Sequence, residues 1–294
     1  LTDEAEIKRI EEFFKKEYAN PIDKKGEAAK VEELKKIVYP FILRRTKEQV
    51  AKDLPDKSEN ILLCEMGSKQ RKVYDAYKNH YRDKLLDLIN EQGIEKSGMY
   101  ILEGLLRLRQ ICDSPALLKD KDLNTEESVK LNELGTQVSE LVAGHKVLIF
   151  SQFVGMLSLI RKQMERKGIE YSYLDGQTRN REEVVADFQN NESKRVFLIS
   201  LKAGGVGLNL TAADYVFLVD PWWNPAVEQQ AIDRTHRIGQ TNKVFAYKMI
   251  CKDTVEEKIL KLQDKKKALV DDIISAEKSL LKSLTKEDVT ELFS

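Results

Sequence analysis

The segment from Ser200 to Leu210 places three glycines, Gly204, Gly205 and Gly207, within four positions, directly after an apolar run typical of a strand. Glycines let the backbone approach a ligand closely and present N–H groups that suit a phosphate. The segment therefore predicts either a phosphate-contacting loop or a tight strand-to-helix turn. A dinucleotide-binding turn fits poorly, because the spacing is not Gly-x-Gly-x-x-Gly and the segment follows the third strand of its region rather than the first.

A second segment, Asp220 to Pro225, contains both tryptophans of the chain, Trp222 and Trp223, between two prolines at the end of a predicted strand. An aromatic ring exposed in a loop can stack on a base or press against a nucleic-acid backbone. We expect at least one of the two rings to pack beneath the loop instead.

A third segment, residues 230–240, carries three polar side chains at helical spacing. If the segment is a helix, Gln230, Arg234 and Arg237 fall at i, i+4 and i+7 and share one face. Such a face can clamp a triphosphate, where an arginine finger contributes roughly 10³–10⁵ in rate. The alternative is a solvated helix with salt bridges to Glu228 and Asp233.

These segments belong to a region, residues 131–253, in which short apolar runs alternate with amphipathic patterns. Repeated β-α-β units predict an α/β fold with a parallel sheet and helices on both faces. Ligands of such sheets bind at the carboxyl ends of the strands. The predicted strands cover 147–150, 171–174, 196–199, 215–219 and 244–250, and the predicted helices cover 156–167, 181–189 and 226–237.

The flanking regions have helical patterns. Residues 1–130 form a predicted helical subdomain, with helices expected around 34–42, 74–89 and 101–111. In residues 254–294, Thr254 is a suitable N-cap, and Glu256 and Glu257 lie in the first turn, where the helix dipole favours anions. We predict that this C-terminal region forms brace helices packed on the sheet domain.

Composition excludes several classes of protein. The 49 basic and 49 acidic residues give a net charge of zero, which excludes binding by bulk positive charge but allows a local basic patch. A run of about 18 apolar residues is missing, so we expect no contact with a membrane. Three widely spaced cysteines indicate a reducing compartment, and the three histidines lack metal-ligand spacing, so we predict no metal site. The chain begins at Leu1 without a signal-peptide pattern or an initiator Met, so we expect a fragment of a longer, intracellular protein.

In their order, these segments resemble the second RecA-like lobe of a Swi/Snf-family ATPase of helicase superfamily two. The resemblance extends over nearly the whole chain after about residue 30, and one departure is Ser114, where the family often has His before the proline. The resembling segments are 146–153 for motif IV, 174–178 for a DNA-facing motif, 200–210 for motif V, 220–225 for its Trp-Asn-Pro extension, 230–240 for motif VI, and 40–47, 53–57 and 106–112 in the helical region.

The resemblance implies a role for each matching position. Arg234 and Arg237 become arginine fingers that reach ATP held by the other lobe, and Gln230 orders that interface. Gly207 and Asn209 are implied to lie near the nucleotide. The residues implied to face DNA are Ser151, Gln152, Gly176, Thr178, Ser200, Lys202, Gly204 and Gly205, with Trp223 against the tracked strand.

Two motifs of a complete motor are missing from the sequence. It contains no Gly-x-x-x-x-Gly-Lys-Ser/Thr and no Asp-Glu-x-His run after a strand. We therefore expect ATP and Mg²⁺ to be held mainly by an N-terminal RecA-like lobe of the same polypeptide, and this chain alone to be inactive. The leading hypothesis is the C-terminal half of a double-stranded-DNA translocase that acts on a DNA-bound protein, in a bacterial cytoplasm (nucleoid) or a eukaryotic nucleus.

Two other classes of function compete with this hypothesis. A non-catalytic DNA- or partner-binding module could retain the fold, but such a module has no need for Gln230, Arg234 and Arg237 together. A nucleotide-dependent metabolic enzyme with a Rossmann-like domain is disfavoured by the glycine spacing and by the lack of a catalytic His-Asp or Lys-Tyr arrangement.

Overall fold

The structure is a computed structural model of the 294-residue chain. It describes residues 4–25, 27–38, 54–118, 125, 127–203, 207–222, 224–270 and 285–294. The motif at 40–47, the start of the motif at 53–57, and Gly204, Gly205 and Trp223 lie outside the described residues. The chain divides into two compact units, Leu1–Asp53 and Leu54–Ser294. Within the described ranges, no helix combines the length and the apolar character needed to cross a bilayer.

The first unit consists of helical segments, as the sequence predicted for this region. They are α1 (Glu4–Phe14), a π-helical turn η1 (Lys15–Ala19), α2 (Asn20–Lys25) and α3 (Ala28–Val38). Tyr18 is buried and donates a hydrogen bond from its hydroxyl to Oε1 of Glu33 at 3.1 Å. Lys30 lies 3.0 Å from the other oxygen of Glu33, so this unit is tied together by one small polar cluster.

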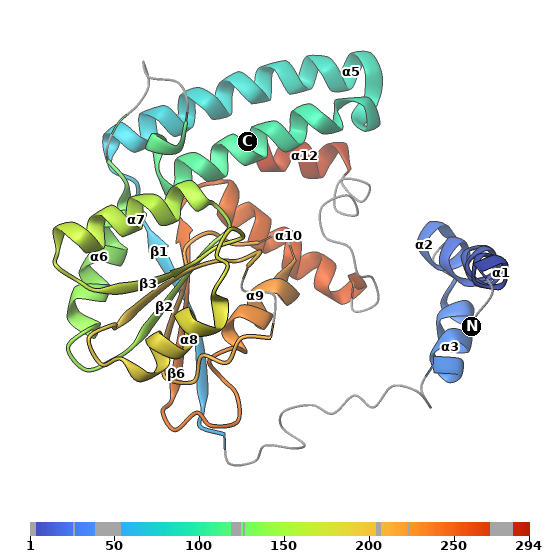
Figure 1. Ribbon diagram of the computed structural model, residues 1–294. Helices are drawn as coiled ribbons and strands as arrows, with labels where there is room; N and C mark the ends of the chain where they lie inside the picture. The colour runs from blue at the N-terminus through green and yellow to red at the C-terminus, as the bar shows by residue number, and fades with distance from the viewer. Residues whose placement is uncertain are drawn as a thin grey trace. The chain divides into compact units, whose positions relative to one another are not determined.

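The second unit is built on one six-stranded, all-parallel sheet, which confirms the predicted α/β fold (Figure 1). The spatial order of the strands is β1-β6-β5-β2-β4-β3. The strands are β1 (Lys57–Cys64), β2 (Val147–Ser151), β3 (Tyr171–Leu174), β4 (Val196–Ser200), β5 (Tyr215–Leu218) and β6 (Val244–Cys251).

Strand β1 corrects the reading of residues 1–130 as helical. It pairs with β6 along its whole length, from Lys57 opposite Val244 to Cys64 opposite Cys251. Its outer edge is unpaired in the described sheet, and most of its side chains are exposed or half-buried. The segment forms a strand because it pairs with β6, since its sequence lacks the continuous apolar run of a strand buried on both faces.

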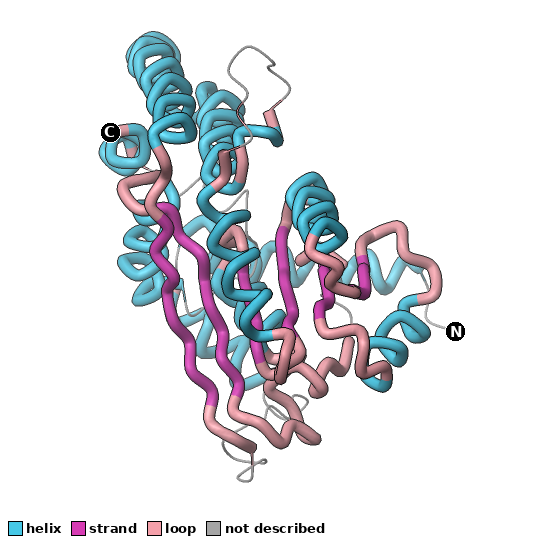
Figure 2. The backbone as a smooth tube through the Cα atoms, turned by 90° about the vertical axis from the view of Figure 1, so that its left-hand side faces the viewer, coloured by secondary structure: helices cyan, strands magenta, loops and turns pink. Residues whose placement is uncertain are grey.

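Helices cover both faces of the sheet (Figure 2). Alternate side chains of each strand enter two different cores, as Val147 and Ile149 do on one face and Leu148 and Phe150 on the other. The first core also contains residues of α5 (Ser68–Asp113), α6 (Val129–Leu141), α7 (Val154–Arg166) and α10 (Val255–Val270). The second core contains residues of α8 (Arg181–Asn190) and α9 (Pro225–Ile232).

A long helical hairpin, α5 (Ser68–Asp113), precedes the α6 helix. Gly93 has φ of 80° and turns the chain back, so the two helices expected around 74–89 and 101–111 form its two arms (Figure 1). A short 3₁₀ turn, η3 (Pro115–Leu117), follows the second arm. The absence of a side chain at Gly104 lets Phe293 of the last helix pack closely, because a Cβ there would lie 2.9 Å from the Phe293 ring.

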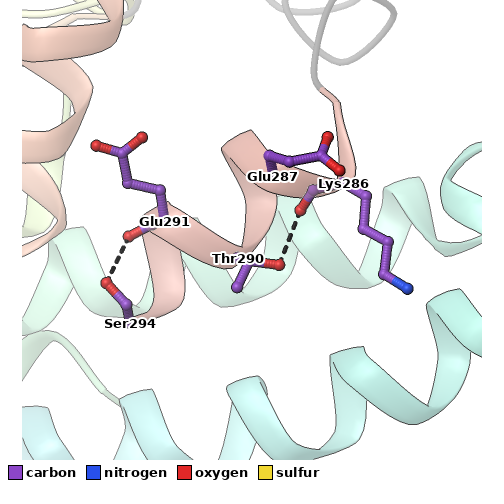
Figure 3. A pocket seen from close by; sticks show the side chains of 5 residues that line it. All are labelled: Lys286, Glu287, Thr290, Glu291 and Ser294. Atoms are coloured by element: carbon purple, nitrogen blue, oxygen red, sulfur yellow. Dashed lines mark hydrogen bonds between the residues drawn. The ribbon is translucent and has the colours of Figure 1, made fainter.

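The C-terminal region begins with the predicted N-cap. Thr254 accepts a hydrogen bond from the backbone N–H of Glu256 at 3.2 Å, at the start of α10. The last helix, α12 (Lys286–Phe293), has a capping box between Thr285 and Asp288 and packs on α5. A shallow hollow beside α12 is lined by that helix and the residue that ends it (Figure 3). The division of the chain at 130/131 and 253/254 stays a prediction.

Candidate functional site

The predicted site residues lie mainly in the loops that follow the carboxyl ends of the strands. The ends of β2 and β4 are in register, with Ser151 opposite Ser200, and the end of β3 lies beside β4, with Leu174 opposite Ile199. Loops that follow these strands therefore emerge along one edge of the sheet. This edge brings together the segments that the sequence placed in motifs IV and V and in the DNA-facing motif.

Two of the proposed DNA contacts lie below the surface of this edge. Ser151 and Ser200 are both buried. The Ser151 hydroxyl accepts a hydrogen bond from the Phe153 N–H at 3.0 Å, and its carbonyl accepts one from the Leu201 N–H at 2.9 Å. The Ser200 carbonyl accepts a hydrogen bond from the Ala203 N–H at 2.9 Å. Because both serines are buried in this structure, they support the loops rather than present hydroxyls to a ligand.

The loop after β3 is shaped by Asp175, which the sequence analysis did not select. Its carboxylate accepts hydrogen bonds from the Gln177 N–H at 2.9 Å, the Thr178 hydroxyl at 3.3 Å and the Tyr173 hydroxyl at 3.1 Å. Partial burial acts to raise the pKa of the Asp175 carboxyl, but these bonds outweigh burial and lower the pKa. The resulting turn leaves Gly176 exposed and Thr178 half-buried, and the Asp-Gly pair was the signal that could have identified it.

The glycine-rich segment presents its polar positions to solvent. Lys202 is exposed between the buried side chains of Leu201 and Ala203. Gly207 and Asn209 are also exposed, and Gly207 has φ of 47°, a left-handed conformation that favours glycine. A cationic side chain and accessible backbone are both available here to an anionic ligand.

The third segment differs from its predicted form. Helix α9 ends at Ile232, so the helix expected to Arg237 is wrong, and Gln230, Arg234 and Arg237 do not form one helical stripe. After the helix, the N–H groups of Arg234 and Thr235 donate to the carbonyls three residues earlier. The Arg234 carbonyl accepts a hydrogen bond from the Leu210 N–H at 3.0 Å. A helix that continued past this point would need the Arg234 carbonyl as an acceptor, and the bond to Leu210 occupies it.

The two arginines nevertheless lie close enough to influence one another. Partial burial lowers the pKa of the Arg234 guanidinium, and the positive charge of Arg237 lowers it further. Arg237 and Gln230 are exposed and Arg234 is half-buried. Two neighbouring guanidinium groups on a solvent-facing turn are suited to binding several oxygens of a polyanion.

Glu228, one of the two acidic residues expected to pair on a solvated helix, has another role. Glu228 is buried, lies 2.5 Å from Lys248 of β6, and accepts the Trp222 N–H at 2.7 Å. Burial raises the pKa of Glu228, against the opposing effect of Lys248. Trp222 itself is 9% exposed and packs in the second core, which confirms that at least one tryptophan lies beneath the loop.

The residues of this edge do not fit a magnesium site. The carboxylate of Asp175 is engaged by three donors, and that of Asp220 is fully buried and accepts the Gln152 N–H at 2.9 Å. A separate group, Cys112, Cys251 and Glu256, has its ligand atoms within 4.8 Å of one another. It is equally unsuitable for a metal, because Lys130 lies 2.7 Å from Glu256 and burial raises the pKa of the Cys251 thiol.

Comparisons with known proteins agree with this arrangement. Residues 5–117 match the model of the SNF2-related domain, and residues 129–239 match that of the helicase conserved C-terminal domain. A putative ATP-dependent helicase/translocase of Bacillus subtilis, YwqA, is 38% identical over 96% of this chain, which spans 31% of that protein. An uncharacterized ATP-dependent helicase of Mycoplasma genitalium is 36% identical over 95% of this chain, which spans 27% of it.

Two solved structures from Sulfolobus solfataricus are similar in both sequence and fold. The SWI2/SNF2 ATPase core in complex with dsDNA is 39% identical, with a TM-score of 0.68, over 95% of this chain and 59% of that chain. The SWI2/SNF2 ATPase C-terminal domain is 35% identical, with a TM-score of 0.64, over 81% of this chain and 98% of that chain.

Proposed function

Because the chain belongs to the Swi/Snf family of helicase superfamily two, we propose that it is the second motor lobe of an ATP-dependent double-stranded-DNA translocase. In this proposal the complete motor remodels protein–DNA complexes by displacing a protein bound to DNA. The chain supplies arginine fingers to the nucleotide and contacts to the DNA backbone.

One hydrogen bond supports this proposal most directly. The N–H of Leu210, at the end of the glycine-rich segment, donates to the carbonyl of Arg234 at 3.0 Å. It links the loop that presents Lys202 and Gly207 to the turn that presents Arg234 and Arg237. A change in the arginine turn on nucleotide binding is therefore passed directly to the loop proposed to contact DNA, which is the connection that a motor needs.

On the nucleotide side, Arg234 and Arg237 neutralise negative charge that develops on the transferred phosphoryl group. Gln230 orders the interface between the lobes, and Gly207 and Asn209 lie near the nucleotide. The phosphate cradle and the Mg²⁺ ligands belong to a preceding lobe of the same polypeptide, because this sequence contains neither motif.

On the DNA side, the exposed Lys202 and the exposed backbone at Gly176 suit phosphate contacts that carry no sequence information. Ser151 and Ser200 hold these loops from beneath. The remaining residues of the proposed DNA surface are Gln152, Thr178, Gly204, Gly205 and Trp223.

The decisive experiment compares ATP hydrolysis by the parent polypeptide, extended upstream of Leu1, with hydrolysis by the 294-residue chain. We expect double-stranded DNA to stimulate turnover by the parent, and the chain alone to show none with or without DNA. A parent that binds DNA but shows no DNA-stimulated turnover would contradict the motor and favour the non-catalytic binding module.

A further inference from the structure

The loop that follows β5, residues 219–222 and here called the β5 loop, is held by three helices that come from distant parts of the sequence. Three of its four backbone carbonyls accept hydrogen bonds from side chains, each of which belongs to a different helix. The pairs are Val219 with Lys130 of α6 at 2.7 Å, Pro221 with Arg109 of α5, and Trp222 with Gln263 of α10 at 2.6 Å.

Two further bonds hold the β5 loop, one to the segment that follows β2 and one to α9. The buried carboxylate of Asp220 accepts the Gln152 N–H at 2.9 Å, and Glu228 of α9 accepts the Trp222 N–H at 2.7 Å. Gln152 follows β2 and belongs to the proposed DNA surface. A displacement of the β5 loop therefore reaches that surface through a single bond.

The bonds to the carbonyls are unusual for a connecting loop. Loops generally lie at the surface, where water satisfies their carbonyls. Here Lys130 is fully buried and Arg109 is 2% exposed. Burying a cationic side chain is costly unless it is paired and hydrogen-bonded, and charge-assisted bonds fix geometry more strongly than neutral ones. The β5 loop is thus held in one position by buried, charge-assisted hydrogen bonds from Lys130 and Arg109.

We propose that Arg109 and Gln263 are positioning residues, which set the β5 loop and, through Asp220, the proposed DNA-contacting segment at Gln152. The hairpin α5 and the helix α10 then determine how the loop meets DNA, although neither helix contributes a residue to the proposed surface. The inference rests on the proposed function for its link to DNA, but the positioning itself is a property of this chain.

The chain contains its own reporter for this test, because its only two tryptophans are Trp222, in the β5 loop, and Trp223, which follows it. Gln263→Leu removes the donor to the Trp222 carbonyl and keeps a side chain of similar size. We expect acrylamide to quench the tryptophan fluorescence of Gln263→Leu more strongly than that of the unmodified chain. We also expect the tryptophan anisotropy of this variant to fall.

Gln137→Leu is the matched control. Gln137 makes its side-chain hydrogen bond to Glu133 within α6, away from the β5 loop, so the same substitution should leave tryptophan quenching unchanged. A second pair of variants, Arg109→Lys and Arg107→Lys, repeats the comparison while retaining positive charge, in case Gln263→Leu folds poorly. Circular dichroism identifies any unfolded variant. Folded Gln263→Leu and Arg109→Lys proteins with unchanged quenching would overturn the proposal.

In the parent polypeptide, the same variants test the link to DNA. We expect the number of triplex-forming strands displaced per ATP hydrolysed to fall by roughly threefold to tenfold for Gln263→Leu, the population change produced by losing one such bond. Gln137→Leu should retain the normal ratio. An unchanged ratio alongside altered quenching would overturn the link to DNA. An unmodified parent without DNA-stimulated turnover would instead contradict the proposed function, while the fluorescence comparison would still decide the positioning.

Discussion

The ammonium of Lys130 lies 2.7 Å from Oε1 of Glu256, and neither side chain has any exposed surface. Asp113 provides a second carboxylate 3.0 Å from the same ammonium. Burial acts to lower the pKa of Lys130, but the two carboxylates outweigh burial and raise the pKa well above its usual value. The three residues lie at the end of α5, the start of α6 and the start of α10, so one buried cation fixes three helices at one point.

Removing that cation should destabilise the fold strongly. In Lys130→Met the carboxylates of Asp113 and Glu256 lose their shared partner, and the free energy of unfolding should fall by about 3–5 kcal/mol. Urea denaturation of the 294-residue chain measures this change. Lys162→Met, at an exposed position of α7, is the control. Adding Asp113→Asn and Glu256→Gln to Lys130→Met should recover part of the lost stability. A loss below about 1 kcal/mol for Lys130→Met alone would contradict the prediction, because a loss of that size is typical of an exposed ion pair.

The arginine turn should govern chemistry rather than DNA affinity. In the parent polypeptide, Arg237→Ala should reduce ATP turnover by roughly 10³-fold, because charge on the phosphoryl group loses a stabilising guanidinium. A DNA-binding titration should show nearly unchanged affinity. Arg166→Ala, at an exposed position of α7, should leave both quantities unchanged. Normal turnover by Arg237→Ala would remove Arg237 from the proposed catalytic set.

Lys202 should act on DNA without regard to sequence. Lys202→Ala should weaken binding of unrelated duplexes to a similar extent and lower the slope of log affinity against log salt by about one ion. The matched substitution Lys162→Ala, on the exposed side of α7, controls for the loss of a surface charge. A salt slope equal to that of the unmodified chain would show that Lys202 makes no phosphate contact.

The loop after β3 should show a defined pH dependence. Because hydrogen bonds lower the pKa of Asp175 in the folded state, the unfolded state binds more protons as the solution is acidified. The stabilisation is fully present above the unfolded pKa of about 3.9 and is lost as pH falls through the lower folded pKa. The unfolding free energies of the chain and of Asp175→Asn should therefore differ near neutral pH and converge in acid. A constant difference would argue against this role.

The sequence predicted the buried strands well and the edge strand poorly. β2 and β4 extend only one residue beyond their predicted bounds, because strands buried on both faces are continuous apolar runs. β3 has its predicted bounds, although its side chains alternate between buried and half-buried. β1 gave no such signal, since much of it faces solvent and its partner β6 lies 187 residues further along the chain. Long-range pairing of this kind is not encoded in local periodicity.

The candidate site shows the same division between local and tertiary information. The glycines and Lys202 predict an accessible loop, and in the structure Lys202, Gly207 and Asn209 are exposed. The end of α9 was not predictable, because the Arg234 carbonyl bonds to Leu210, a residue on another segment. The side chains that bond to the β5 loop could not be predicted for the same reason, because nothing near Gln263 in the sequence identifies the Trp222 carbonyl as its partner.

The pairing of the first strand with the last has a consequence for biosynthesis. β1 ends at residue 64, and its only partner in the described sheet, β6, ends at residue 251. At about 5–20 residues per second, the ribosome needs roughly 10–40 s to add the intervening 187 residues. During that time β1 has no neighbour, and Ile61 and Leu63, which stay exposed even in the folded unit, remain open to other nascent chains. Chaperone binding to this strand would therefore protect the chain during its synthesis, until β6 is available to pair with β1.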